Sequence, residues 1–150
     1  LTEPLRQLAA IRLKELTDSI RMSVPGAKII CTGDFNDTEN SAAISLLTSG
    51  GNGNNNLHLI DPTEGEIPGT IKYQGIWQRI DHFILSESFF NDPFGYNADS
   101  SSCTIIAKDF LLERDMSRGG MKPRRTYFGH KYNGGLSDHL PVLLELNLRK

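Results

Sequence analysis

Three short polar clusters lie inside or at the ends of apolar runs in this sequence of 150 residues. They are Gly33–Asp37 (GDFND), Arg79–His82 (RIDH) and Ser137–His139 (SDH). Among their residues are three candidate acids (Asp34, Asp81 and Asp138), an amide and at least one imidazole, at the ends of expected strands. Carboxylate and amide oxygens are ligands for hard cations such as Mg²⁺ or Mn²⁺, and histidine exchanges protons near neutral pH. The set therefore suits hydrolysis assisted by a divalent cation.

Each cluster also has a structural interpretation. Asp34 and Asn36 are two residues apart, which fits an Asx-type turn that caps the following helix. The Asp81 carboxylate lies within an apolar strand and needs a partner there, for which either an imidazole or Arg79 would serve. The Ser137–His139 cluster precedes the last strand, so a surface turn accounts for it equally well.

Other chemistries lack their signatures. The sequence contains neither a Gly-x-Ser-x-Gly nucleophile motif nor a phosphate-binding P-loop. Its two cysteines, Cys31 and Cys103, have a spacing that forms no metal motif and no disulfide framework. No apolar run approaches the roughly 20 residues of a membrane-spanning helix. With 38% hydrophobic and 23% charged residues, the composition predicts one folded domain.

The charge is distributed unevenly along the chain. The net charge is −2, yet the stretch from Arg118 to Ser137 contains five cations and no acid. Such a segment on an otherwise acidic chain suits an anionic ligand such as a phosphate, and a solvated loop is the alternative. The five cations are Arg118, Lys122, Arg124, Arg125 and Lys131.

A long amphipathic helix is predicted near the start of the chain, from Glu3 to Ser23, and Pro25-Gly26 ends it. Its apolar residues fall within an arc of about 140°, which we expect to be buried. Arg12 lies within this arc and has to extend to solvent or form a pair. The residues of the arc are Leu5, Leu8, Ala9, Leu13, Leu16 and Ile20.

The elements that position the polar clusters are mostly short strands. Ala27–Thr32 is apolar on both faces and predicts an interior strand, followed by a loop over Gly33–Thr38. A short helix is expected at Ser41–Thr48, and the Gly- and Asn-rich Gly50–Asn56 is expected to be an exposed, mobile loop. Segment 115–135 is expected to be irregular. Further strands are predicted at Leu57–Ile60, Thr70–Gln74, Arg79–Ser86, Cys103–Ala107 and, with strict alternation, Val142–Leu148.

The three clusters, read as Gly33–Asn36, Arg79–His82 and Ser137–Val142 in this order, resemble the endonuclease/exonuclease/phosphatase superfamily. Thr70–Gly75 and Tyr132–Leu136 look most like its bacterial, Bacteroidetes-type members. The resemblance implies an α/β (α+β) fold, the four-layer α/β/β/α sandwich. Residues 1–150 would form its C-terminal half, a mixed and largely antiparallel sheet with helices on one face.

The resemblance also implies a metal-dependent phosphoesterase that uses Mg²⁺ or Mn²⁺. By position, Asp34 would position or deprotonate the attacking water, and Asn36 would orient the water or contact the phosphate. His139 would donate a proton to a phosphate oxygen while Asp81 holds its imidazole in place. Asp138 would contribute to the metal site, together with Asp34 and Asn36.

Residues near Asp81 are candidates for substrate binding. Aromatic side chains there would stack on the substrate and cations would contact phosphate, although packing beneath a loop is an equal alternative. The neighbouring His82 is expected to be a structural histidine. The candidates are Lys72, Tyr73, Trp77 and Arg79.

The resemblance further implies a family domain whose N-terminal half carries an Asn and a Glu for the metal, with residues 1–150 corresponding only to the C-terminal portion. We therefore expect catalysis to need that other half, with a non-catalytic assembly or binding module as the alternative. Expected substrates are phosphate esters: nucleic acid, a lipid head group or an inositol phosphate. An apolar sheet face left uncovered would favour a homodimer. The localisation stays open.

Overall fold

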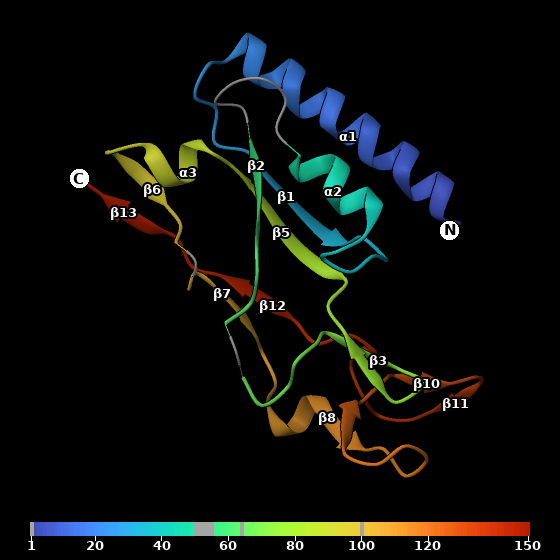
Figure 1. Cartoon of the computed structure of the whole chain (residues 1–150). Helices are drawn as coiled ribbons and strands as arrows, with labels where there is room; N and C mark the ends of the chain where they lie inside the picture. Colours follow the sequence, from blue (N-terminus) through green and yellow to red (C-terminus); the bar gives the residue numbers. More distant parts are fainter. Residues whose placement is uncertain (1, 50–55, 64, 100) are drawn as a thin grey trace.

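The computed structural model describes residues 2–49, 56–63, 65–99 and 101–150. At its centre is an antiparallel sheet of three strands in the order β1-β5-β2 (Figure 1). Strand β1 spans Ile30–Asp34, β5 spans Asp81–Ser86 and β2 spans Leu57–Ile60. In the part of the chain described here, no helix combines the length and apolar character that crossing a membrane requires.

Two helices cover one face of this sheet. Helix α1 spans Glu3–Ser23, and helix α2, Ala42–Thr48, packs beside it. The α2 N-cap is Ser41, whose side chain accepts a hydrogen bond from the Ile44 amide at 3.2 Å. The core between helices and sheet consists of Ala10, Cys31, Ala43, Ile44, Leu47, Leu57 and Ile84.

Pairs of short strands cover the opposite face of the sheet. Strand β7 (Cys103–Ile105) pairs with β12 (Val142–Leu144), and β6 (Gly95–Asn97) pairs with β13 (Asn147–Arg149). Successive β5 residues point to opposite faces, so Ile84 joins the helix-side core while Leu85 joins the second one. This second core, next to helix α3 (Ser88–Asn91), consists of Ile60, Leu85, Phe89, Ala98 and Cys103.

Three hairpins form the remaining part of the molecule, below the sheet in Figure 1. The first joins β3 (Ile71–Tyr73) to β4 (Ile76–Gln78). The second, preceded by the 3₁₀ turn η1 (Asp109–Leu111), joins β8 (Leu112–Arg114) to β9 (Met121–Pro123). The third joins β10 (Tyr127–Phe128) to β11 (Lys131–Tyr132).

A buried ion pair ties the first hairpin to the second. The Lys72 ammonium lies 3.2 Å from the Asp115 carboxylate and also donates to the Gly119 carbonyl at 2.5 Å. Burial opposes ionisation of Asp115, yet backbone donors at Arg118 and Ser117 together with Lys72 hold its pKa below the ordinary value. The pair fixes the position of both hairpins.

Much of the predicted secondary structure is confirmed. The helix at Glu3–Ser23 and the strand at Leu57–Ile60 have the predicted bounds. The predicted helix at Ser41–Thr48 is α2 with its cap, and the predicted strand at Arg79–Ser86 starts two residues later, at Asp81. Most of the predicted loop at Gly50–Asn56, namely residues 50–55, lies outside the described residues.

Other predictions are wrong in their details. Segment 115–135 is not irregular throughout, since it contains β9, β10 and β11. The last strand is split into β12 and β13, and Leu148 is 56% exposed. The predicted interior strand at Ala27–Thr32 is shifted to Ile30–Asp34 and, among the described strands, lies at the edge of its sheet. Its run of apolar residues does not imply partners on both sides.

The expected buried arc of α1 is also wrong. The helix packs with a neighbouring stripe, in which Ala10, Thr17 and Arg21 are buried. Most of the apolar arc faces outward, and Arg12 within it pairs with Glu15 at 2.6 Å. Hydrophobic periodicity shows which residues favour burial, whereas the neighbouring elements decide which are covered. The exposed members include Leu5, Leu8, Leu16 and Ile20, with 50%, 51%, 58% and 39% exposure.

Candidate active site

The first two polar clusters meet at one end of the central sheet. Strand β1 ends at Asp34, β5 begins at Asp81, and these two residues are directly opposed in the antiparallel register. Residues opposed in this way place their side chains on the same face of a sheet. The face is the one turned away from the helices, because Cys31 of β1 and Ile84 of β5 point to the helix side.

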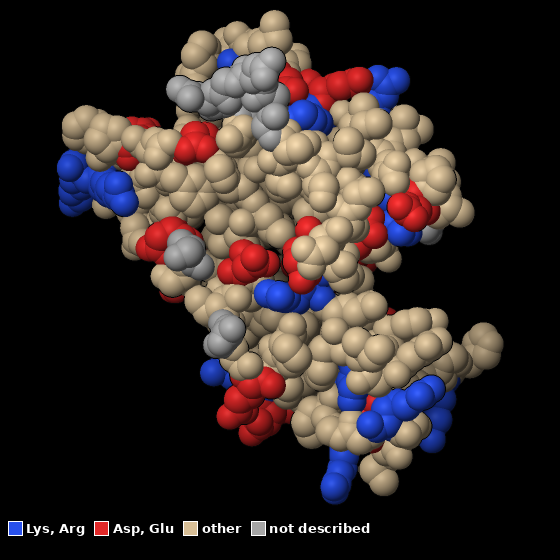
Figure 2. All heavy atoms as spheres, in the orientation of Figure 1, with Lys and Arg blue, Asp and Glu red and all other residues tan. Residues whose placement is uncertain are grey.

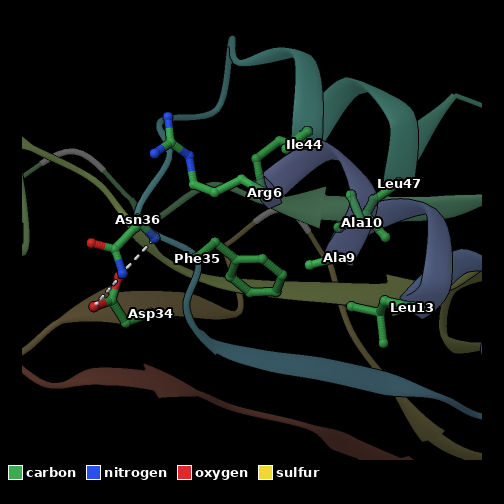
Figure 3. A pocket seen from close by; sticks show the side chains of 10 residues that line it. Arg6, Ala9, Ala10, Leu13, Asp34, Phe35, Asn36, Ile44 and Leu47 are labelled. Atoms are coloured by element: carbon green, nitrogen blue, oxygen red, sulfur yellow. Dashed lines mark hydrogen bonds between the residues drawn. The ribbon is translucent and has the colours of Figure 1, made fainter. Parts of the chain in front are cut away.

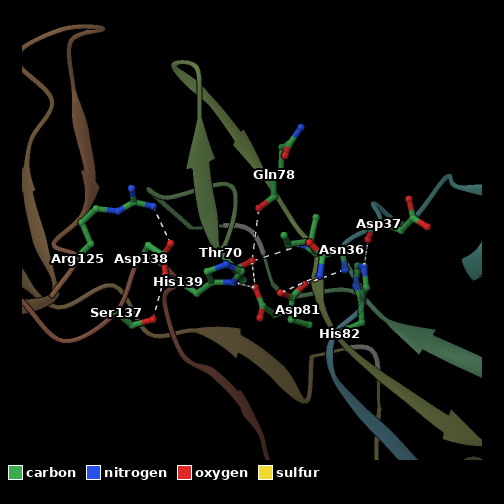
Figure 4. A network of polar contacts seen from close by, with 12 residues as sticks. Asn36, Asp37, Thr70, Gln78, Asp81, His82, Arg125, Ser137, Asp138 and His139 are labelled. Atoms are coloured by element: carbon green, nitrogen blue, oxygen red, sulfur yellow. Dashed lines mark hydrogen bonds and ion pairs between the residues drawn. The ribbon is translucent and has the colours of Figure 1, made fainter. Parts of the chain in front are cut away.

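The third cluster reaches this place through His139. Its Nδ1 atom lies 2.8 Å from an Asp81 carboxylate oxygen, across a sequence separation of 58 residues (Figure 4). The Thr70 hydroxyl donates to the same oxygen. The chain around His139 is held by a bridge to Ile71 and by a 2.7 Å bond from the Leu140 amide to the Thr70 carbonyl. The base of the first hairpin thus fixes the imidazole.

This geometry selects the tautomer of the neutral imidazole. With Nδ1–H donating to Asp81, the neutral ring leaves Nε2 as the atom that can accept or return a proton. Both side chains are mostly shielded, with 22% exposure for His139 and 16% for Asp81. The expected alternative partner, Arg79, instead lies near Glu39 and Asp61, at 3.5 and 3.7 Å.

Asp34 and Asn36 form the turn that their spacing allowed. The Asn36 amide donates to Asp34 at 2.8 Å, and the Asn36 side-chain amide does so at 3.2 Å. Asn36 has a φ of 54°, a left-handed conformation that asparagine tolerates. The turn does not cap α2, since Ser41 does; both residues are exposed, and Asp34 is opposed to Asp81 in the strand register.

A small, mainly apolar pocket of about 200 Å³ adjoins this turn (Figure 3). Phe35 separates the turn from the apolar wall, and Arg6 lies at the mouth with its guanidinium 2.7 Å from Asp37. The pocket lies between α1, α2 and the end of β1. Its apolar wall is formed by Ala9, Ala10, Leu13, Ala43, Ile44 and Leu47.

Asp138 is paired with a cation in this structure. Arg125 lies 2.6 Å from its carboxylate, and both side chains are about half exposed. Arg125 and Lys122 also lie over the Phe128 ring, at 5.7 and 4.6 Å from its centre. Figure 2 shows Lys and Arg side chains gathered on the part of the surface where Figure 1 places the hairpins.

The predicted substrate-binding residues have different surroundings. Lys72 is buried in its ion pair, whereas Tyr73 is 61% exposed on the same strand. Trp77 is half-buried opposite Lys72 in the hairpin, and Arg79 is held near two acids. The structure therefore leaves Tyr73 the most accessible of the four.

His82 lies on the opposite face of β5 from Asp81. It is 3% exposed, its Nε2 atom lies 2.8 Å from the Asp37 carbonyl, and its ring contacts Phe35. These are the surroundings of a structural histidine.

Two residues of the site were not among the sequence candidates. Thr70 stands out in the sequence only as the start of a predicted strand and of the family-like segment Thr70–Gly75, because its contact with Asp81 depends on how the chain folds back. Arg125 belonged to the basic segment, and only the tertiary structure places it against Asp138.

The described residues do not assemble a metal centre by themselves. Among them, no group of three or more His, Cys, Asp or Glu side chains is placed to hold an ion. Asp34 and Asn36 bond to each other, and Arg125 neutralises Asp138. A divalent cation at this site would need further donors.

A comparison with protein-family models matches residues 1–148 to the model described as the Endonuclease/Exonuclease/phosphatase family. Searches of curated proteins and of solved structures each found no match. The match covers nearly the whole chain, including all three polar clusters, and the mixed α+β architecture agrees with it. The chain therefore belongs to the endonuclease/exonuclease/phosphatase family.

Proposed function

We propose that this chain takes part in the hydrolysis of a phosphodiester or a phosphomonoester, with His139 and Asp34 as its reactive groups. The observation that carries the proposal is the 2.8 Å contact between Asp81 and His139, directly beside Asp34. Family membership supports phosphate-ester hydrolysis as the class of reaction. The geometry brings an acid–base pair and a second carboxylate to one place.

The residues divide the chemistry between them. Asp34 orients or deprotonates the attacking water, and Asn36, bonded to it, orients the water or contacts the phosphate. His139 presents Nε2 to a phosphate oxygen and stabilises the charge that develops there. Asp81 fixes the tautomer and the orientation of the ring. Thr70 holds Asp81 in this orientation.

We further propose that residues 1–150 are the C-terminal portion of a family domain in the four-layer α/β/β/α arrangement, of the Bacteroidetes type. In this proposal, donors outside the described residues bind Mg²⁺ or Mn²⁺ with Asp138, Asp34 or Asn36. The cation, when bound, would neutralise charge on the phosphoryl group. The shortage of ligands among the described residues supports the view that the chain alone is incomplete.

The proposed substrate is a phosphate ester. The basic segment that carries Arg125 lies next to His139 and suits a polyanion. An exposed Tyr73 offers a ring for stacking. Nucleic acid, a lipid head group and an inositol phosphate all present the phosphate that these residues would contact.

The test is hydrolysis of bis(p-nitrophenyl) phosphate by the full-length protein with Mg²⁺ or Mn²⁺. His139→Gln and Asp34→Asn should each lower kcat about 10²- to 10⁴-fold, the usual contribution of a positioned acid or base. His130→Gln is the matched control, since His130 is exposed in the turn between β10 and β11. Turnover at the wild-type rate in both site variants would remove the assignment.

A non-catalytic assembly or binding module is the second candidate, favoured by the shortage of metal ligands. Inorganic phosphate separates the two on the chain itself. A catalytic site predicts that phosphate shifts the His139 ring resonances in an NMR titration and leaves those of His130 unchanged. Equal shifts or none favour the binding module.

A further inference from the structure

The chain around His139 is held from two sides, and the first is the base of the β3–β4 hairpin. His139 forms a bridge with Ile71, and the Leu140 amide donates to the Thr70 carbonyl at 2.7 Å. The Thr70 hydroxyl also donates to Asp81, the partner of the His139 ring. The β3–β4 hairpin therefore contacts both members of the acid–base pair.

The residues that follow β9 hold the same chain from the other side. The Leu136 amide donates to the Arg124 carbonyl at 3.1 Å, and the Leu136 carbonyl accepts from the Thr126 hydroxyl at 2.7 Å. Between these two contacts along the chain, Arg125 reaches Asp138 at 2.6 Å (Figure 4). The residue directly before the catalytic imidazole is thus tied to the segment that continues β9.

A glycine lets these two stretches of chain lie against each other. A Cβ atom on Gly135 would lie 1.8 Å from the Arg124 carbonyl oxygen, far inside van der Waals contact, so only glycine permits this approach. Arg124 is in turn anchored at the start of the β8–β9 hairpin, because its amide donates to the Leu111 carbonyl at 2.7 Å. The β8–β9 hairpin therefore sets the position of the second group of contacts.

The two hairpins that hold His139 are themselves joined through Lys72 and Asp115. Lys72 follows Ile71 in β3, and its ammonium lies 3.2 Å from the Asp115 carboxylate in the β8–β9 loop. The two side chains are only 5% and 8% exposed, so each charge depends on the other for its stabilisation. The same ammonium donates to the Gly119 carbonyl of that loop.

We infer that Lys72 and Asp115 are positioning residues for His139. The imidazole lies between two hairpins, and the buried ion pair sets the spacing of these hairpins. Lys72 is one of the cations that the sequence predicts to bind substrate, but its ammonium is buried and acts on the site through the backbone of β3. The effect on turnover rests on the proposed function, whereas the effect on the orientation of the ring does not.

NMR of the full-length protein with ¹⁵N-labelled histidine tests the orientation of the ring, at a pH at which the ring is neutral. In the wild type, the His139 nitrogens should report a single tautomer with its proton on Nδ1, and His139→Gln assigns the signal. Lys72→Met should shift these resonances toward those of the exposed His130, because the ring would no longer be held against Asp81.

Asp115→Asn gives a milder change at the other member of the pair. Its side-chain oxygen can still accept from the Ser117 and Arg118 amides, so the β8–β9 loop keeps its turn while the charge is lost. The His139 resonances should shift in the same direction. The double variant Lys72→Met/Asp115→Asn should shift them no further than Lys72→Met does, because the two residues act as one unit.

Kinetics with bis(p-nitrophenyl) phosphate separate a positioning role from contact with the substrate. Lys72→Met should lower kcat about tenfold to a hundredfold and leave KM within about twofold, since a catalytic group displaced by about 1 Å has an effect of this size. Lys28→Met is the matched control and should keep both parameters. Lys28 also pairs with an acid, Asp92, and with two backbone carbonyls, but it lies at the other end of β1 from Asp34.

Circular dichroism checks that each variant folds, and Asp115→Asn carries the test where Lys72→Met does not. Unchanged His139 resonances in the folded variants would overturn the inference, and so would a raised KM with an unchanged kcat. If His139→Gln itself leaves turnover unchanged, the proposed function fails, and the resonances still decide whether the ion pair positions the ring.

Discussion

At the scale of single residues, the Asp81 carboxylate decides what the site can do. A carboxylate within an apolar strand requires hydrogen-bond partners, and here it has the His139 ring and the Thr70 hydroxyl. The contact with His139 satisfies the Asp81 carboxylate and also orients the imidazole. Structure and chemistry therefore rest on one side chain.

The buried cysteines give a prediction at this scale. Burial, assisted by the nearby Asp61 charge, raises the pKa of the Cys103 thiol from 9.0 to about 11. At pH 8 the folded chain should therefore contain about a hundredth of the thiolate of the unfolded chain, and Cys103 should react with a thiolate-directed reagent correspondingly slower. A Cys31→Ala variant isolates the signal, and urea should restore the fast rate.

The raised pKa of Cys103 also determines how the stability of the fold changes with pH. Since the unfolded thiol releases its proton at a lower pH than the folded one, Cys103 lowers the stability of the fold as the pH rises above about 9. Equal labelling rates in the folded and unfolded chain would contradict this account.

At the scale of elements, the residues that end a helix predicted its bounds better than the apolar pattern predicted which of its residues are buried. Helix α1 ends before Pro25-Gly26 as predicted, and Gly26 adopts the positive φ of +80° that follows many helices. Its apolar arc, in contrast, did not identify the packed side. The β3–β4 hairpin was missed in part: its turn, at Gln74 and Gly75 with φ of 49° and 90°, begins at the last residue of the strand expected at Thr70–Gln74.

The cap of α2 gives a prediction for an element. Replacing Ser41 with Ala removes the acceptor of the Ile44 amide, and should cost about 1 kcal/mol of unfolding free energy. Ser45→Ala, at an exposed position of the same helix, is the control and should be nearly neutral. Urea unfolding followed by circular dichroism measures both, and equal midpoints for the two variants would show that the cap contributes nothing.

At the scale of the whole molecule, the layers explain how the candidate site is assembled. Helices lie on one face of the central sheet and strand pairs on the other, and the start of β5 meets the last polar cluster through the contact of Asp81 with His139. The described part of this arrangement brings together Asp34, Asp81 and His139. It does not bring a third metal ligand to them.

Metal binding provides the prediction at this scale. Because Arg125 neutralises Asp138 and the described acids form no cluster of three, the 150-residue chain should bind Mn²⁺ only weakly. Isothermal titration calorimetry measures this directly, with buffer as the blank. Tight binding of one ion per chain would mean that the chain holds a complete site, and would reject the proposed need for further donors.

The sequence by itself determined the family and the local elements. The three polar clusters and their order led to the family that the comparison confirms, and apolar runs with capping and breaking residues located α1, α2, β2 and β5. These features depend on residues close together in the chain, so their signals are local. The fold class followed from the resemblance to the family.

Only the tertiary structure decided how distant residues meet. Asp81 and His139 are 58 residues apart, and their contact depends on the hairpin base that holds both. Three further features likewise depend on which neighbours are present among the described residues. They are the edge position of β1, the exposed apolar arc of α1 and the pairing of Arg125 with Asp138. Periodicity records what a side chain prefers, whereas burial and pairing depend on the surfaces that the rest of the chain brings to it.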